Sequence, residues 1–91
     1  MSLKKVKLFA NLREAAGTSA VEIPGDDIKE LLDNLIAKYP SLEEIVLEED
    51  GKIRGYINIL VNGNNIQHLD GLDTRVSDSD EIAMFPPVSG G

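Results

Sequence analysis

DIKELLDNLIAKYP, residues 27–40, decides the fold of this chain, because its apolar residues recur at the spacing of an α-helix. They would form one continuous stripe made of Ile28, Leu31, Leu32, Leu35, Ile36 and Tyr39. Asp27 can cap the helix start with Glu30 as its capping-box partner, and Pro40 ends the helix because proline disfavours helical geometry at the residue before it. The sequence therefore predicts one amphipathic helix whose apolar side other elements must cover.

Two short strands are predicted before this helix. Residues 4–10 alternate between an apolar face, which includes Ala10, and an outer face, which includes Phe9. Gly17 suits a turn or a helix stop, and residues 19–24 form the second strand. Together these strands would make a hairpin-like start with a long connection.

The segment after the helix predicts a third strand, a tight turn and a last strand. Residues 57–61 alternate, with Leu60 on the outer side. The Asn-Gly pair that follows is typical of a hairpin turn, and a short return strand is expected near residues 65–67. In the last strand, Phe85 lies on the outer side.

This order of elements predicts an α+β domain in which a mixed sheet is covered on one face by a single main helix, the β-grasp arrangement. We assign residues 1–85 to the domain and residues 86–91 to an extended tail. Because one helix covers only one face, Phe9, Leu60 and Phe85 would form a joint exposed patch on neighbouring strands. Scattered exposed apolar residues are normal, but three large ones side by side favour a protein-binding face.

Composition narrows the function classes. The chain has 91 residues and a net charge of −7, which suits one small domain and disfavours nucleic acid as a partner. It has no cysteine, which excludes disulfides, thiolate nucleophiles and cysteine metal sites. No apolar run approaches the roughly 20 residues of a membrane span, and the lysine-rich start lacks the apolar segment of a signal peptide. We therefore expect a cytoplasmic protein without a membrane partner.

Acidic residues cluster in residues 41–50, which could form a short helical turn or an irregular segment. The cluster is either a solvated surface or a docking face for a basic partner. His68, the only histidine, has no second ligand or base near it in the sequence, so we expect it at the surface. The sequence predicts no metal site.

The chain ends with FPPVSGG, residues 85–91. Pro86 and Pro87 end strand pairing and favour extended geometry, so the tail would project from the domain. Ser89, Gly90 and Gly91 carry no bulky side chains and could enter a narrow channel. The tail would then display a carboxylate without steric cover.

Three stretches carry a resemblance to a known family: VKLFANLREAAG at residues 6–17, LVNG at residues 60–63 and DSDEIAMFPPVSGG at residues 78–91. In these stretches the sequence resembles the ubiquitin-like sulfur carriers of the MoaD/ThiS family. The paired prolines before the two glycines are closer to the molybdopterin synthase small-subunit branch than to the thiamine carriers. Residues 41–54 are longer and more acidic than in compact members of the family.

The resemblance implies a sulfur donor without catalytic activity of its own and without a bound cofactor. An E1-like adenylyltransferase would use ATP to adenylate Gly91, and sulfur would convert that carbonyl into a thiocarboxylate. The tail, with Gly90 allowing it to thread, would then enter the large subunit of molybdopterin synthase. There the sulfur would pass to a pyranopterin precursor of the molybdenum cofactor. The outer-face residues Phe9 and Phe85 match positions of apolar partner contacts in the family.

Other acceptors stay open at this point. The same thiocarboxylate could supply tRNA thiolation, thiamine synthesis or cysteine synthesis, or an adenylated Gly91 could be joined to lysines as in ubiquitin-like modifiers. A third hypothesis is a purely structural β-grasp adaptor that binds partners through its apolar face and has an inert tail.

Overall fold

The computed structural model describes residues 3–54 and 57–86, so the tail residues from Pro87 to Gly91 lie outside the described part. Along the chain the elements are β1 (Leu3–Leu8), α1 (Asn11–Ala16), β2 (Ala20–Pro24), α2 (Ile28–Lys38), α3 (Glu43–Val46), β3 (Asn58–Val61), β4 (Asn64–Asn65) and β5 (Glu81–Phe85). The described residues also contain three 3-10 turns, namely η1 (Pro40–Leu42), η2 (Ile66–His68) and η3 (Gly71–Asp73). The division into domain 1–85 and tail 86–91 stays a prediction.

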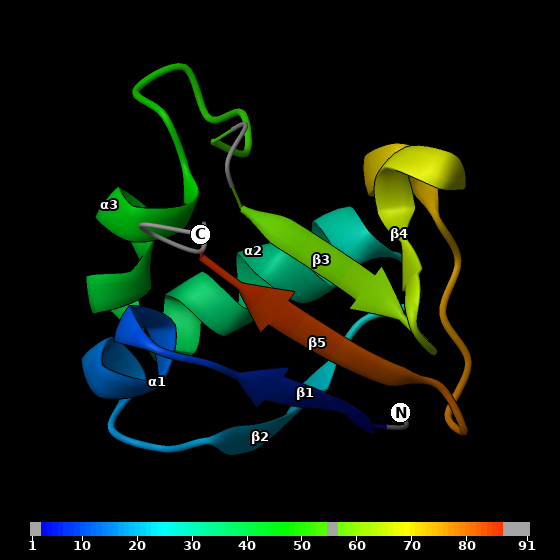
Figure 1. Cartoon of the computed structure of the whole chain (residues 1–91), viewed down its shortest axis with the longest axis horizontal. Coiled ribbons are helices and arrows are strands. Elements are labelled where there is room, and N and C mark those ends of the chain that lie inside the picture. The colour runs from blue at the N-terminus through cyan, green and yellow to red at the C-terminus, as the bar shows by residue number, and fades with distance from the viewer. Residues whose placement is uncertain (1–2, 55–56, 87–91) are drawn as a thin grey trace.

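The strands form one mixed sheet in the order β2-β1-β5-β3-β4. The central pair, β1 and β5, is parallel, and the other neighbouring pairs are antiparallel. Figure 1 shows α2 lying behind this sheet, across β5 and β3, while the opposite face of the sheet points toward the viewer. The predicted β-grasp fold, with one main helix on one face of a mixed sheet, is confirmed.

The two capping residues that predicted the start of α2 form the expected kind of hydrogen bonds. The Asp27 carboxylate accepts a hydrogen bond from the Glu30 backbone N–H at 2.8 Å. The Glu30 carboxylate accepts one from the backbone N–H of Asp26 at 3.1 Å, so the capping box closes one residue earlier than predicted. The helix ends at Lys38, two residues before Pro40.

The hydrophobic core lies between α2 and the inner face of the sheet. Val6 and Leu8 of β1 and Met84 of β5 are at most 1% exposed. The chain enters α2 through Gly25, where a Cβ atom would lie only 2.8 Å from the Leu31 Cα. Only glycine therefore allows β2 and α2 to approach this closely.

Ala10 is not on the core face, contrary to the prediction. The strand β1 stops at Leu8, and Ala10 takes a left-handed backbone conformation with φ 52° and ψ −128°. The Leu12 N–H donates to the Phe9 carbonyl at 3.1 Å across this turn. The helix α1 begins after this turn, and its fully buried Leu12 lies in the core in place of the predicted Ala10. Gly17, with φ 77°, caps α1, as a helix stop requires.

Two further segments differ in detail from the prediction. The return strand β4 covers Asn64–Asn65, and the chain turns into η2 at Ile66, so the predicted strand near 65–67 is placed too late. Residues 41–50, for which the sequence allows a short helical turn or an irregular segment, contain the end of η1 and the short helix α3. In the described residues, no helix combines the length and apolar character needed to cross a bilayer.

Candidate functional site

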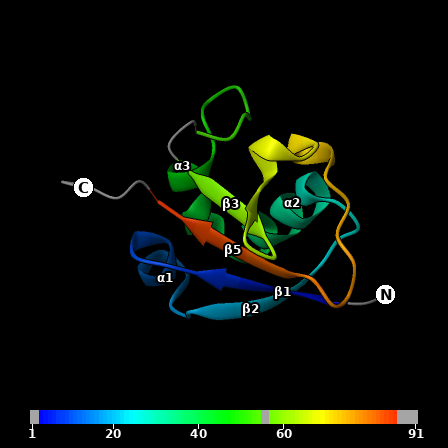
Figure 2. The ribbon, with the colours of Figure 1, turned by 45° about the vertical axis from the view of Figure 1, so that its right-hand side comes forward.

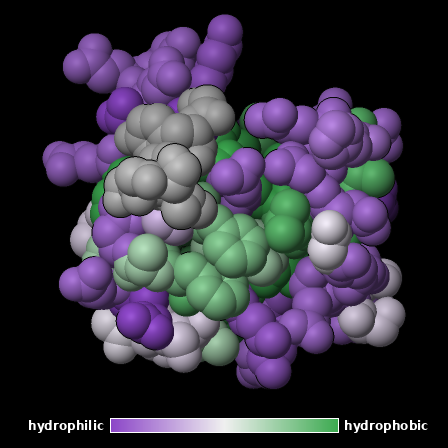
Figure 3. Space-filling view, viewed as in Figure 1, coloured by the Kyte–Doolittle hydropathy of each residue, from purple (hydrophilic) through white to green (hydrophobic). Residues whose placement is uncertain are grey.

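The open face of the sheet, opposite α2, carries the predicted apolar patch on β1, β5 and β3. Phe9 is 38% exposed, and Phe85 and Leu60 are half-buried. Leu60 pairs with Ala83 of β5, which is also half-buried and adds a small apolar side chain to the patch. Figure 3, seen from this side, shows apolar atoms gathered over the middle of the sheet within a hydrophilic border.

Phe9 and Phe85 form a stacked aromatic pair. Their ring centroids lie 4.5 Å apart, and the ring planes are inclined by 13°. Leu8 pairs with Met84 in the parallel β1–β5 ladder, so the next residue of each strand comes to the same place. The turn at Ala10 begins directly after Phe9, and β5 ends at Phe85 directly before Pro86. The aromatic pair therefore sits where the chain leaves the sheet toward its tail.

Polar contacts cover the rest of the open face. The Lys7 ammonium lies 2.9 Å from a carboxylate oxygen of Glu81. The hydrogen bond from Lys7 and then its positive charge lower the pKa of Glu81 below its ordinary value. Asn65 donates to the side chain of Asn58 at 3.3 Å. The open face is thus apolar near the end of β5 and charged near its start.

The start of β5 is fixed by Asp80. Its carboxylate accepts the Ser77 backbone N–H at 2.8 Å and the Asn62 side-chain amide at 2.8 Å. The Ser77 hydrogen bond, followed by the one from Asn62, lowers the pKa of Asp80. The carbonyl oxygen of the Asn62 side chain accepts the Glu81 N–H at 3.0 Å, so the β3–β4 turn is tied to β5.

Lys4 anchors the same end of the sheet from inside. It lies on the core face of β1 and is 2% exposed. Its ammonium is 3.4 Å from Asp78 and 3.7 Å from Asp26, two exposed carboxylates on different loops. The buried stem and paired head group hold the loop before β5 against the loop before α2. The opposite end of β5, at the aromatic pair, is the end that continues into the tail.

One part of the acidic residues 41–50, the helix α3, lies near this tail end, and the loop that follows α3 extends away from it. In Figures 1 and 2, the end of β5 lies between α1 and α3. The acidic side chains of α3 and of the loop that follows it are exposed, namely Glu43, Glu44, Glu48, Glu49 and Asp50. Across the described ranges, no three acidic or histidine side chains come close enough together to hold a metal ion. His68 is exposed on η2, as predicted.

The structure brings together only part of the predicted site. Phe9 and Phe85 touch, Leu60 lies on the same face, and Pro86 is half-buried directly after β5. The tail residues Pro87, Ser89, Gly90 and Gly91 lie outside the described residues, and their roles stay predictions. Sequence reasoning missed the charged pair of the open face, Lys7 and Glu81, although both have the outward parity of their strands.

Comparison with known proteins shows the family. Residues 6–91 match the model of the ThiS family. Small archaeal modifier protein 1 of Haloferax volcanii is 42% identical over 88 residues, which cover 93% of this chain and 97% of that protein. The molybdopterin synthase sulfur carrier subunit of Escherichia coli is 36% identical over 89 residues, covering 96% and 98%.

A solved structure matches the fold as well as the sequence. The solution structure of small archaeal modifier protein 1 from Methanosarcina acetivorans superposes with a TM-score of 0.88 at 52% identity, covering 100% of this chain and 98% of that one. Fold, open apolar face and sequence thus agree, and the chain belongs to the ThiS/MoaD family of ubiquitin-like sulfur carriers.

Proposed function

We propose that this chain carries sulfur as a thiocarboxylate on Gly91 and delivers it as the small subunit of a molybdopterin synthase. The observation that carries the proposal is the stacked pair of Phe9 and Phe85 on the open face. Phe85 directly precedes Pro86, the first residue of the predicted tail. An exposed apolar face beside the start of a thin tail suits a protein that docks on an enzyme and inserts its terminus.

The chemistry begins with activation of the terminus. A carboxylate at neutral pH is a poor electrophile, because its negative charge repels nucleophiles and oxide is a poor leaving group. In the proposed first step, a Gly91 carboxylate oxygen attacks the α-phosphorus of ATP on an E1-like adenylyltransferase, and pyrophosphate leaves. Hydrosulfide released from a sulfur donor then attacks the acyl-adenylate carbonyl, AMP leaves, and loss of a proton gives the thiocarboxylate. Because this chain has no cysteine, the sulfur must come from another protein or from a small donor.

The second step takes place on the large subunit of molybdopterin synthase. Docking through the aromatic pair would bring the thiocarboxylate to the pyranopterin precursor. The five residues 87–91 span at most about 18 Å when fully extended. The acceptor must therefore lie within that distance of Pro86, which directly follows the docking face, and this makes docking a requirement for transfer.

A second candidate function uses the same activated terminus with a different acceptor. The 52% identity with a small archaeal modifier protein supports conjugation of Gly91 to lysine side chains of other proteins. In that case a lysine amine attacks the acyl-adenylate, AMP and a proton leave, and an amide bond forms instead of a thiocarboxylate. Sulfur delivery to tRNA, thiamine or cysteine synthesis would use the first step unchanged.

The experiment starts with the chain co-expressed with its E1-like enzyme. A gain in intact mass equal to the difference between sulfur and oxygen, located at Gly91, identifies the thiocarboxylate. Addition of the large subunit and the pyranopterin precursor should then form molybdopterin and return the mass to that of the free acid. A variant without Gly90 and Gly91 serves as the control. An unchanged mass contradicts the sulfur carrier, and lysine adducts without precursor conversion favour the modifier.

A further inference from the structure

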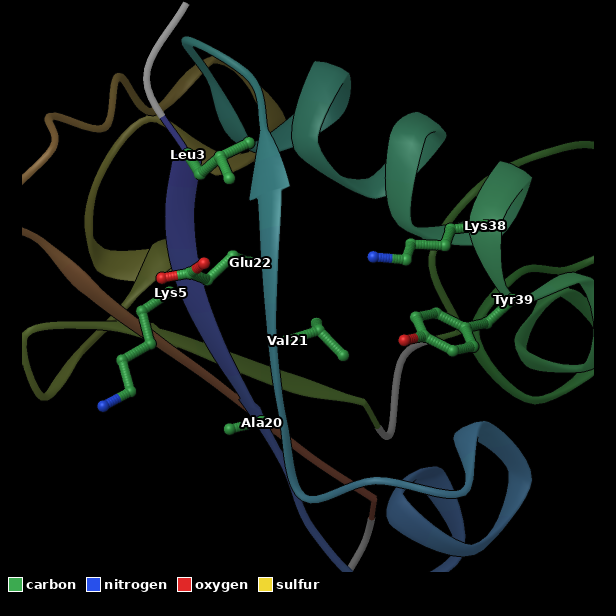
Figure 4. Close-up of a pocket in the computed structure, with 7 residues that line it drawn as sticks. All are labelled: Leu3, Lys5, Ala20, Val21, Glu22, Lys38 and Tyr39. Carbon is green, nitrogen blue, oxygen red and sulfur yellow. The ribbon is translucent and has the colours of Figure 1, made fainter.

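The edge of the sheet at β2 carries a groove that the proposed function does not use. It has a volume of about 450 Å³ and extends around the edge of β2, from Leu3 and Lys5 of β1 on one side to Lys38 and Tyr39 at the end of α2 on the other. We call it the β2 groove and define it by Val21, Glu22, Lys38 and Tyr39. Figure 4 shows Lys38 and Tyr39 reaching from α2 toward Val21, while Glu22 lies on the opposite side of the strand.

The backbone of β2 offers one open pairing position. The Leu8 N–H donates to the Ser19 carbonyl at 2.9 Å, so Ser19 faces β1. Since hydrogen-bonded positions alternate along an antiparallel ladder, Val21 and Ile23 face β1 too, and Glu22 points its N–H and carbonyl outward. No hydrogen bond within the described residues occupies these two groups of Glu22.

The neighbouring outward positions are already closed. The Thr18 hydroxyl contacts the Ala20 carbonyl at 3.0 Å and the Ala20 N–H at 3.4 Å. Pro24 has no N–H, and its carbonyl accepts from the Asn34 amide at 2.8 Å. The edge is therefore blocked at both ends and open at its centre, which limits an incoming strand to one register.

Charge favours an acidic occupant. Lys5 lies directly across from Glu22 in the β1–β2 register, so an opposite charge is on the same face of the sheet as Glu22. Lys38 is exposed, forms no ion pair within the described residues and stacks over the Tyr39 ring at 5.8 Å. The groove thus presents an uncompensated ammonium on a chain whose net charge is −7.

We propose that the β2 groove binds an extended strand of a partner protein with a glutamate at the position opposite Val21. In an added antiparallel strand, the residue opposite Glu22 would exchange two backbone hydrogen bonds with it. The next residue of that strand points to the other face, between Val21 and the end of α2. A glutamate there places its methylene groups on Val21 and Tyr39 and its carboxylate near Lys38.

A second copy of this chain fits the groove less well. Antiparallel pairing of two β2 edges about the open position would place Glu22 of each copy directly opposite the other. Two like charges in a directly opposed pair are destabilising. The β2 groove also lies at the edge strand of the sheet, whereas the aromatic pair lies over β1 and β5 on the open face. The chain could therefore hold such a strand while its open face is docked on an enzyme.

The test uses the full-length chain labelled with 15N and the pentapeptide acetyl-TVTET-amide. Saturable shifts should appear at the amides of residues 20–23, and hydrogen exchange of the Glu22 amide should slow. The matched peptide acetyl-TVTKT-amide should bind up to about fivefold more weakly at low salt, the effect of an exposed ion pair. The variant Lys38→Glu should reverse this preference, because it exchanges the charges of the pair.

A second variant, Glu22→Pro, tests the predicted backbone hydrogen bonds between β2 and the added strand. Glu22→Pro removes the outward N–H but none of the hydrogen bonds to β1, so an edge strand tolerates it. Binding of acetyl-TVTET-amide should fall by about tenfold or more in this variant. Shifts confined to Phe9, Leu60 and Phe85, an unchanged affinity in folded Glu22→Pro, or no saturable shift would each overturn the proposal. If Glu22→Pro fails to fold, the charge exchange at Lys38 still decides it.

Discussion

Replacing Ala10 with glycine is expected to stabilise the domain. Ala10 has φ 52° and ψ −128°, a conformation that costs a non-glycine residue about 1–3 kcal/mol. Glycine adopts it without strain, but loses about 0.5–1 kcal/mol more conformational entropy on folding than alanine. The Ala10 side chain is exposed, so its removal leaves no cavity. The net expectation is a gain of about 1 kcal/mol in the free energy of unfolding.

The assay is thermal and urea unfolding followed by far-UV circular dichroism. For a domain of this size, about 1 kcal/mol raises Tm by about 4–8 °C. Gly17→Ala is the matched control, because Gly17 has φ 77° and an added Cβ would meet no atom within 4 Å. It should lower the stability by about 1 kcal/mol through the backbone alone. An Ala10→Gly variant with the wild-type Tm or a lower one would refute the reasoning from backbone strain.

Four further variants test the anchors and the docking face. Because Asp80 has a lowered pKa, it should stabilise the fold above its ordinary value of 3.8, and this contribution should disappear as the pH falls further. The stability difference between wild type and Asp80→Asn in urea titrations should therefore shrink below that pH. Lys4→Met should keep the free energy of unfolding within about 1 kcal/mol of the wild type, because the Met side chain replaces the buried methylene stem of Lys4. Lys4→Glu should unfold the domain, because it buries a carboxylate beside Asp26 and Asp78. Phe85→Lys should weaken binding to the E1-like enzyme and to the synthase large subunit in titration calorimetry, while a large drop in Tm would show that its ring belongs to the core.

The elements predicted correctly are those whose signals are local. The capping residues Asp27 and Glu30 and the terminating Pro40 all lie within α2 or next to it, so the sequence alone locates the helix. Alternation in residues 4–10 also placed Lys4 on the same side as Val6. That parity was a usable signal for the burial of Lys4, although the type of residue suggests a surface position.

The errors come from places where the chain changes direction. Alternation cannot show that β1 stops at Leu8, so Ala10 was placed on the core face. The helix α1 is only six residues long and buries Leu12 alone, too little to produce an apolar stripe. A signal was present, since Arg, Glu and Ala residues precede Gly17, and strong helix formers before a glycine are typical of a short capped helix.

The aromatic pair combines a predictable part with an unpredictable one. Strand parity and strand order place Phe9 and Phe85 on one face of neighbouring strands. Their contact depends on the register that pairs Leu8 with Met84 across 76 positions of the chain, and no local pattern fixes that register. The sequence therefore predicted the face and not the stacking.

Under the proposed function, the choice of acceptor would depend on the docking surface, because the proposed activation changes only the terminal carboxylate. Sulfur transfer and lysine conjugation would both begin from the same acyl-adenylate at Gly91, so the chemistry of that atom cannot distinguish them. Because the extended tail can span only about 18 Å, the acceptor would be the one presented by the protein that occupies the open face around Phe9 and Phe85. Substitutions on that face should change the ratio of thiocarboxylate consumption to lysine conjugation, whereas substitutions at Gly91 should abolish both.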